Sequence, residues 1–285
     1  VEHILAAVGD NGNAIIDLMN EGAFKNRITE PWIEGTLDII EAWERRSGND
    51  IFVGMDFDHM YKKRDPGLEY VLAHPRMELI ICEGSEGHVV RDLTAGTRKP
   101  IKDALAAAYR RKYKKPIVST NGPTYSAAET PDVSRLYQWA SMMLKVQGVG
   151  VYAKDYPLDF ESDPVKKYAR QSEILLDFFD SFSDYVVLDL ASERILESSN
   201  KYQYALAAPG ELVVYLHRGE YGAISEPGGT LRVETPGVPN GRIMLRVLHP
   251  ANGNSKSVPG SVRDEIMEVT LPSYAEDLAL HLKSR

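Results

Sequence analysis

An amide and a carboxylate stand side by side at Asn20 and Glu21, directly after the apolar run at residues 14–19. A short apolar run of this kind is typical of a buried strand. In a β/α barrel, the residues that follow the carboxyl ends of the strands build the active site. A carboxylic acid at such a position can give up and recover a proton. The pair therefore indicates acid–base chemistry of the kind that acts on sugars.

Glycosidic hydrolysis needs a second carboxyl group, about 5–5.5 Å from the first for retention of configuration and roughly 6.5–9.5 Å for inversion. Glu83 is the best candidate because it directly follows the apolar run at residues 79–82, and neighbouring strands lie only about 4.8 Å apart. The alternative is an ordinary loop carboxylate in segment 83–87. For Glu21, the alternative is a carboxylate at a helix start, where the helix dipole favours negative charge.

Other polar and aromatic side chains follow further predicted strands and are candidate substrate contacts. They are His59, His88, Asn121, Tyr125 and Tyr156. A lone histidine is also commonly just a hydrogen-bonded surface or core residue, and this alternative stays open for both histidines. Trp139, in contrast, lies at helical spacing with Leu136 and Met143 and is predicted to pack in the core.

Asp56, Asp58 and His59 place carboxylates and an imidazole close together in the sequence, and both groups can ligate a metal ion. The sequence offers no matched second cluster, so we predict no metal site and no cofactor.

Composition narrows the functional classes. The formal net charge is −8 and no basic stripe is present, which disfavours a nucleic-acid partner. No run of about 18 apolar residues predicts a membrane span. The single cysteine, Cys82, excludes an intrachain disulfide. These features indicate a globular protein without nucleic-acid or membrane partners.

The chain divides into two patterns. Up to about residue 183, apolar strands alternate with amphipathic helices, which predicts βαβ units and a parallel sheet. The predicted strands are 14–19, 51–57, 79–82, 117–120 and 150–152, and the predicted helices are 31–46, 68–73, 101–113, one capped by Asp132, and 164–182. The residues from Glu2 to Val8 look like the tail of a further helix.

After residue 183, short strands alternate with Pro- and Gly-containing turns, which predicts a β-sandwich. The predicted strands are 185–190, 202–207, 212–216, 231–234, 243–248, 266–270 and 278–282. Pro259–Gly260 is among the predicted turns. We therefore predict two domains, 1–183 and 184–285.

Several stretches resemble one group of proteins, the apiosidase-like members of the clan-A-type glycoside hydrolases. The similar stretches in the first domain are 13–22 for strand four, 115–118 for strand seven and 135–152 for the last helix–strand unit. Those in the second domain are 207–216, 246–253 and 271–282, which resemble the β-sandwich that follows the barrel and is named for collagen binding.

The resemblance implies an α/β plus all-β fold: strands 4–8 of a (β/α)8 TIM-type barrel, then a small antiparallel β-sandwich. It implies a glycoside hydrolase acting on a polysaccharide or oligosaccharide, with Glu21 as general acid/base and Asn20 as the amide that holds a sugar hydroxyl. It also implies a secreted or periplasmic location, although a cytoplasmic one stays open.

The sequence departs from this family in two respects. Strand seven ends in Ser119–Thr120–Asn121–Gly122, without the family's second carboxylate. Three barrel strands are also expected before Val1, so we predict a fragment or processed chain completed by an upstream segment or a partner chain. An open five-stranded doubly wound sheet is the structural alternative. A glycosidase-like protein that binds carbohydrate or forms assemblies without turnover is the functional one.

Overall fold

The computed structural model describes residues 1–8, 15–19, 28–57, 66–82, 112–119, 131–149, 161–182, 184–219 and 224–284. Contacts group the chain into two compact units. The first unit contains residues 1–87, 101–122 and 146–150, and the second contains residues 88–100, 123–145 and 151–285.

The first unit is built on parallel strands. They are β1 (Ile15–Asp17), β2 (Phe52–Gly54), β3 (Asp56–Phe57), β4 (Ile80–Cys82), β5 (Ile117–Ser119) and β6 (Val146–Val149). β1 pairs with β2, and β3, β4, β5 and β6 form a second ladder in that order. Only Met55 separates β2 from β3, so the six segments correspond to the five strands predicted from the sequence.

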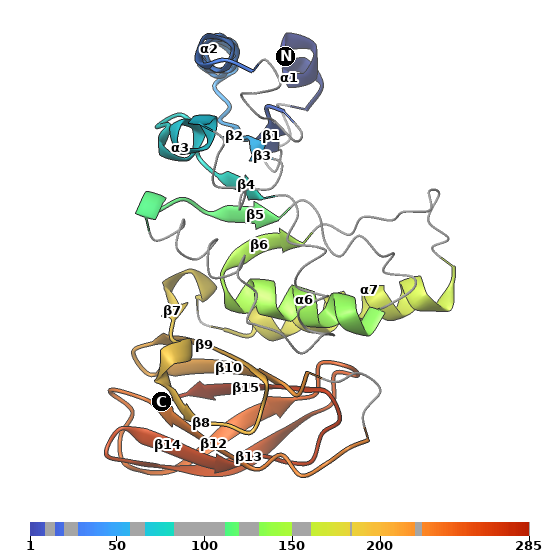
Figure 1. The fold of residues 1–285 in the computed structure, drawn as a ribbon, viewed down its shortest axis with the longest axis vertical. Helices are drawn as coiled ribbons and strands as arrows, with labels where there is room; N and C mark the ends of the chain where they lie inside the picture. Colours follow the sequence, from blue (N-terminus) through green and yellow to red (C-terminus); the bar gives the residue numbers. More distant parts are fainter. Residues whose placement is uncertain are drawn as a thin grey trace. The chain divides into compact units, whose positions relative to one another are not determined.

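Strand order in this unit follows the order along the chain (Figure 1). A doubly wound sheet reverses its strand order at a switch point, and the described strands have no such reversal. The alternative of a doubly wound sheet is therefore wrong for these strands. The last strand also begins earlier than predicted, at Val146, and the predicted residues 150–152 lie outside the described residues.

Helices α1 (Glu2–Val8), α2 (Glu30–Ser47) and α3 (Pro66–Ala73) belong to the same unit. α2 begins where Thr29 accepts a hydrogen bond from the Trp32 backbone N–H, and it ends at Gly48 in the left-handed conformation. Both features are typical helix boundaries. The helix predicted over 31–46 is confirmed, whereas most of the one predicted over 101–113 lies outside the described residues.

The two faces of the strands are both apolar. Val53 is buried and lines a groove together with Leu37 and Ile40 of α2, so α2 covers this face. On the opposite face, a Cβ atom at Gly54 would lie 2.8–2.9 Å from side-chain atoms of Ile81 and Leu79. Glycine at this position therefore lets neighbouring strands pack closely.

The second unit contains helices α6 (Pro131–Met143) and α7 (Asp163–Asp180) and the 3₁₀ turns η2 (Tyr185–Val187) and η3 (Ser192–Arg194). Its strands are β7 (Asp189–Leu190), β8 (Ile195–Glu197), β9 (Tyr202–Ala208), β10 (Glu211–His217), β11 (Thr230–Glu234), β12 (Gly241–Leu248), β13 (Ser255–Arg263), β14 (Ile266–Thr270) and β15 (Asp277–Lys283). All are antiparallel, in the order β7-β9-β10-β15-β12-β13-β14-β11-β8.

In place of the two separate sheets of the predicted sandwich, the pairing shows one continuous sheet. β12 pairs with β13 along its whole length but with β15 only through Arg246–Leu248. The sheet curls at β12, so that β9, β10 and β15 lie opposite β11, β13 and β14 (Figure 1). Their inward side chains share one core, which includes Leu212, Val214, Leu231, Val247 and Val269.

Two local predictions in this unit were wrong. Pro259–Gly260 lies inside β13, where Pro259 faces Met244 of β12 and the pairing with β14 begins only at Gly260. Proline, which lacks an N–H donor, is tolerated where one side of a strand has no partner. The segment predicted as a strand over 185–190 forms η2 and then the short β7.

Helix α6 packs on the outer face of β9 and β10, and α7 packs against α6. Trp139 of α6 is fully buried and stacks on Tyr215 of β10 with ring centroids 5.3 Å apart. Its ring also contacts Phe178 of α7 at 5.2 Å. The predicted core position of Trp139 is thus confirmed, and β10 is buried on both faces. None of the described helices has the length and apolar character that crossing a membrane requires.

Candidate functional site

The predicted site residues follow the carboxyl ends of the parallel strands. Glu21 comes four residues after β1, Glu83 directly after β4 and Asn121 two residues after β5. Because the strands are parallel, their carboxyl ends lie at one edge of the sheet.

The side chains themselves lie outside the described residues, so their roles stay predictions. This holds for Asn20, Glu21, His59, Glu83, His88, Asn121, Tyr125 and Tyr156.

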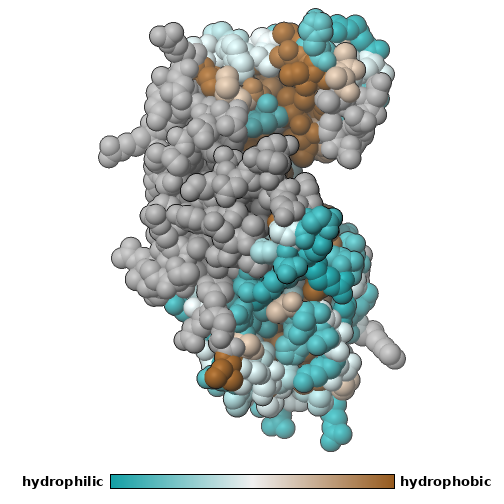
Figure 2. Space-filling model, turned by 90° about the vertical axis from the view of Figure 1, so that its right-hand side faces the viewer, coloured by the Kyte–Doolittle hydropathy of each residue, from teal (hydrophilic) through white to brown (hydrophobic). Residues whose placement is uncertain are grey.

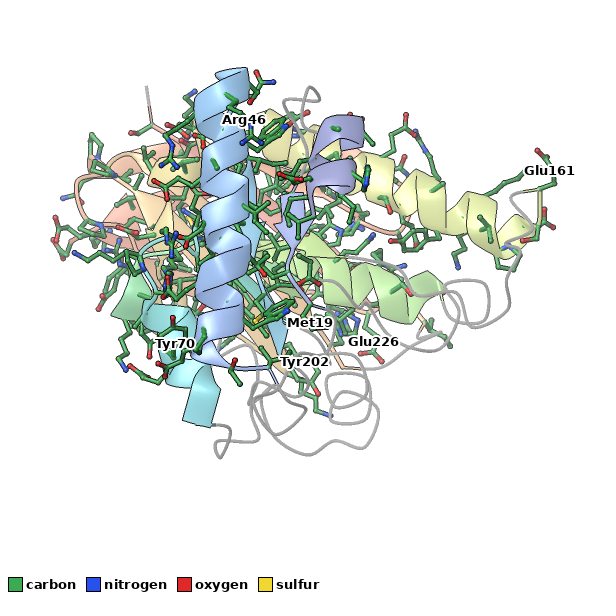
Figure 3. The ribbon with its side chains drawn as sticks, turned by 90° about the horizontal axis from the view of Figure 1, so that it is seen from above. Met19, Arg46, Tyr70, Glu161, Tyr202 and Glu226 are labelled. Carbon is green, nitrogen blue, oxygen red and sulfur yellow. The ribbon has the colours of Figure 1, made fainter. Side chains whose placement is uncertain are left out.

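The described end of β1 shows how the chain approaches Glu21. The Leu18 N–H donates to the Gly54 carbonyl at 3.0 Å, which extends the pairing with β2 by one residue. The Met19 N–H then donates to Oδ1 of Asp17 at 3.3 Å. Met19 lies just beyond the strand and is exposed (Figure 3). A side-chain oxygen that accepts from the backbone two residues on is typical of a turn, so the chain leaves the strand at this point.

The strand order also sets coarse distances along the sheet. β4 is two strand positions from β1, since β2 and β3 together occupy the position between them. Two spacings of about 4.8 Å separate these strands by about 10 Å. β5 is one position further, at about 14 Å.

In the first unit, a network of side-chain hydrogen bonds ties α2 to α3. Glu34 of α2 accepts hydrogen bonds from the Tyr70 hydroxyl and from Arg76, and lies 2.8 Å from Nε2 of His74. Tyr70 and His74 lower the pKa of Glu34 to about 2. Burial, together with Glu34, raises the pKa of Tyr70 to about 12. Figure 3 shows Tyr70 beside α2, so this network holds two neighbouring helices together.

A second charged cluster lies in the second unit, called the curled-sheet unit below; the first unit is called the parallel-strand unit. Arg135 of α6 is fully buried, and its guanidinium donates to Asp277 at 2.9 Å and to Glu276 at 2.6 Å. It also pairs with Asp132, and the Tyr215 hydroxyl donates to Asp277 at 3.0 Å. Burial alone would lower the pKa of Arg135, but Asp277 raises it. A permanent cation between carboxylates anchors α6 to the sheet.

The sequence prediction of Asp132 as a helix cap was wrong, because Asp132 lies inside the first turn of α6. Its carboxylate instead contacts Arg135, Lys167 and Gln171. The network could not be recognised in the sequence, because Arg135 and Asp277 are 142 residues apart.

Two histidines of the curled sheet are also buried. Burial lowers the pKa of His217 to about 4, so its ring is neutral near pH 7. His281 lies 2.7 Å from Glu211, and burial lowers its pKa despite this carboxylate. Within the described ranges, no three His, Cys, Asp or Glu side chains come together as a metal site would require.

Comparison with known proteins gives a fold and no family. No protein-family model matches the sequence, and no curated protein is significantly similar to it. Among solved structures, one described as a glycoside hydrolase aligns with 99% of this chain and 67% of its own, with a TM-score of 0.67 and 10% identity.

Two further solved structures are similar. A glycoside hydrolase family 5 protein from Bacteroides vulgatus ATCC 8482 aligns over 86% of this chain and 59% of its own, with a TM-score of 0.55 and 12% identity. A GH30 endoxylanase from Clostridium papyrosolvens C71 aligns over 98% and 68%, with a TM-score of 0.52 and 13% identity. The chain thus has the fold of glycoside hydrolases and spans about 59–68% of the length of these three.

Proposed function

We propose that this protein is a glycoside hydrolase acting on a polysaccharide or oligosaccharide, with Glu21 as the general acid/base. The observation that carries the proposal is the series of parallel strands in chain order, in which β1 ends four residues before Glu21 and β4 ends directly before Glu83. The fold likeness to glycoside hydrolases supports it. Carboxylate pairs at such an edge are what glycosidic hydrolysis requires.

The strand spacing favours inversion. Glu83 follows a strand about 10 Å from β1, which is nearer to the roughly 6.5–9.5 Å between the carboxyl groups of inverting enzymes than to the 5–5.5 Å of retaining ones. In this proposal Glu83 activates water while Glu21 protonates the leaving oxygen. Asn20 holds a sugar hydroxyl, and the substrate contacts come from His59, His88, Asn121, Tyr125 and Tyr156.

We further propose that the parallel strands are strands four to eight of a TIM-type barrel. Among the described strands, β1 pairs only with β2. On the face away from α2, Ile15 of β1 is 48% exposed and Phe52 of β2 is 55% exposed, although they are paired residues. Figure 2 shows apolar surface on this unit. Three more strands, from an upstream segment or a partner chain, would cover both the edge and these side chains.

The same proposal extends to the second unit. Its strand order and the stretches at 207–216, 246–253 and 271–282 support a likeness to the domain that follows the barrel in apiosidase-like proteins. A secreted or periplasmic location belongs to this proposal.

The test replaces Glu21 by Gln. The protein is produced together with the upstream segment or partner chain that completes the proposed barrel. A panel of plant and bacterial polysaccharides is screened for new reducing ends. We expect Glu21→Gln to lower kcat by about 10²–10⁴-fold, the usual contribution of general acid–base catalysis. The control is Glu161→Gln, an exposed carboxylate before α7. Unchanged turnover in Glu21→Gln would rule out the proposed role.

The anomeric configuration of the first product, followed by NMR, tests Glu83 separately. Inversion together with loss of activity in Glu83→Gln supports the assignment. Retention of configuration would assign the second carboxylate to another residue.

A second candidate function is carbohydrate binding without turnover. It is favoured by the absence of a carboxylate in Ser119–Thr120–Asn121–Gly122, where the resembling family has one. A glycan that binds the completed protein but releases no reducing ends, with or without Glu21, would support this function over hydrolysis.

A further inference from the structure

An open groove lies on the outer face of the curled sheet, in the half formed by β8, β11, β12, β13 and β14. Its volume is about 790 Å³. Three arginines line it, Arg232 from β11, Arg242 from β12 and Arg263 from β13, together with the polar residues Asn240 and Ser261. With Asp264 and Glu268 also in the lining, the groove has three basic and two acidic side chains, whereas the chain as a whole has a net charge of −8.

Strand pairing brings these side chains into one row. Arg242 faces Ser261, Ser261 faces Glu268, and Glu268 faces Arg232. Directly opposed residues in antiparallel strands point to the same face of a sheet. The neighbouring side chains Val233, Val262 and Met267 point the other way, into the core. The row therefore presents guanidinium, hydroxyl, carboxylate and guanidinium groups in sequence on the outside.

Arg242 and Arg263 differ from Arg232 in their partners. Arg232 lies 3.7 Å from both Glu197 and Glu268. Within the described part of the chain, neither the Arg242 nor the Arg263 guanidinium has an ion-pair or hydrogen-bond partner. Since Arg263 lies two residues after Ser261, the two arginines are diagonal neighbours, and such positions are about 7–8 Å apart. Both forks are thus available to one ligand.

Arg263 is also held in place by its turn. The β13–β14 hairpin turns at Asp264 and Glu265, which have φ values of 50° and 62°. The Asp264 N–H donates to Asn240 Oδ1 at 2.9 Å, and the Thr235 N–H donates to the Glu265 carbonyl at 2.6 Å. Non-glycine residues in this conformation are strained and persist only when surrounding contacts fix them. The hairpin therefore fixes the backbone from which the Arg263 side chain extends.

We propose that this groove binds an acidic polysaccharide. Arg242 and Arg263 would each hold a carboxylate or sulfate group, because the guanidinium fork matches such anions in a bidentate manner. Ser261, Asn240 and Glu268 would contact sugar hydroxyl groups, for which they supply donors and acceptors. The proposal does not depend on Glu21 or on hydrolysis.

The composition of the groove argues against nucleic acid. Glu268 and Asp264 lie among the arginines, and their carboxylate oxygens accept hydrogen bonds from hydroxyl groups, which a polysaccharide carries along its length and a single-stranded DNA does not. None of the described lining residues is aromatic, whereas single-stranded nucleic acids are usually held by stacking on aromatic rings. A polymer that carries both hydroxyl and anionic groups, an acidic polysaccharide, therefore fits the groove better.

The test measures binding of the full chain to polygalacturonate, dextran sulfate, neutral dextran and a single-stranded oligodeoxynucleotide, by titration calorimetry at low and high salt. The variant is Arg242→Gln with Arg263→Gln. The control is Arg45→Gln with Lys256→Gln, which removes the same charge from exposed positions outside the groove. Thermal unfolding of each variant shows that it is folded.

We expect at least one acidic polysaccharide to bind, neutral dextran not to bind, and affinity to fall with salt. The groove variant should bind at least tenfold more weakly than wild type, and the control should bind like wild type. Preference for polygalacturonate or dextran sulfate tells whether the groove takes carboxylate or sulfate. Binding of neither polymer, equal binding by the groove variant, equal weakening in the control, or tighter binding of the oligonucleotide would each overturn the proposal.

Discussion

The two units of this protein handle charged side chains in opposite ways. In the parallel-strand unit, Arg76 is 30% exposed and pairs with Glu34, Asp38 and Glu41, all of them well exposed. In the curled-sheet unit, Arg135 is fully buried and is surrounded by carboxylates, of which Asp277 is itself buried. Each arginine has three carboxylate partners, so the two networks differ in burial and not in the number of ion pairs.

The units also differ in how completely their strands are covered. The parallel strands have two to four residues each, and Ile15 and Phe52 are exposed. The curled sheet has strands of up to nine residues, and its inward side chains form one buried cluster. The difference suggests that the curled sheet and its helices supply most of the described core, while the parallel strands carry the proposed chemistry.

Replacing the central arginine of each network gives the largest expected contrast. Arg135→Met leaves buried carboxylates without a partner, and we expect it to lower the free energy of unfolding of its unit by about 3–5 kcal/mol. Arg76→Met removes exposed ion pairs only, and we expect a loss of about 1 kcal/mol or less. Urea unfolding followed by Trp139 fluorescence, in a background with Trp32→Phe and Trp43→Phe, reports on the curled-sheet unit.

Hydrogen exchange of peptides from α2 and α3 reports on the parallel-strand unit in the same variants. Equal losses from Arg135→Met and Arg76→Met would contradict the view that burial distinguishes the two networks. The double replacement Arg135→Met with Asp277→Leu serves as a control, since removing both charges should restore part of the stability.

Acid should destabilise the curled-sheet unit first. The pKa of His217 is about 4 in the folded protein, below its ordinary value of 6.5. The folded state therefore binds fewer protons than the unfolded state between these values. The stabilisation is complete above pH 6.5 and is lost as the pH falls to 4, by at most about 3 kcal/mol. Burial also lowers the pKa values of His249 and His281, which act in the same direction.

The parallel-strand unit should respond differently in this pH range. Burial raises the pKa values of Glu44 and Glu78, so their protonation on acidification favours the folded state. The lowered pKa of Glu34 acts in the opposite direction, but only as the pH falls below its ordinary value of 4.5. Unfolding free energies from Trp139 fluorescence between pH 7 and 4 measure the curled-sheet unit, and hydrogen exchange of peptides from α2 and α3 over the same range measures the parallel-strand unit. His217→Gln is the variant whose curled-sheet unit should show a shallower dependence. A profile that His217→Gln leaves unchanged would exclude this histidine as the cause.

Local features of the sequence were sufficient to predict most elements, because apolar periodicity reflects the faces that each element buries. The helix at α2 and the strands at β4, β5, β9 and β10 were predicted within a few residues. Pro259–Gly260 misled the prediction because the same residues occur in turns and in strands that have lost one neighbour. Periodicity does not distinguish these cases, whereas strand pairing does.

Candidate site residues could be predicted only where a residue's place relative to a single strand was enough to identify it. Glu21 and Glu83 could be proposed because each directly follows an apolar run, but the distance between them depends on the curvature of the sheet. The groove could not be predicted, since Arg242 and Arg263 become neighbours only through the register of β12 with β13. The same holds for Arg135, whose partners come from distant parts of the chain.

The smallest expected contrast concerns the starts of the two long helices, α2 and α7, which have 18 residues each and a proline in the first turn. Thr29 accepts a hydrogen bond from the Trp32 N–H, whereas Ser162 makes no side-chain cap bond. We therefore expect Thr29→Ala to cost about 1 kcal/mol through the lost cap bond, and Ser162→Ala to destabilise the first turn of α7 less, because no cap bond is lost there. Hydrogen exchange of the first turn of each helix measures both, and an equal or larger effect at Ser162 would show that the cap bond of Thr29 does not stabilise α2.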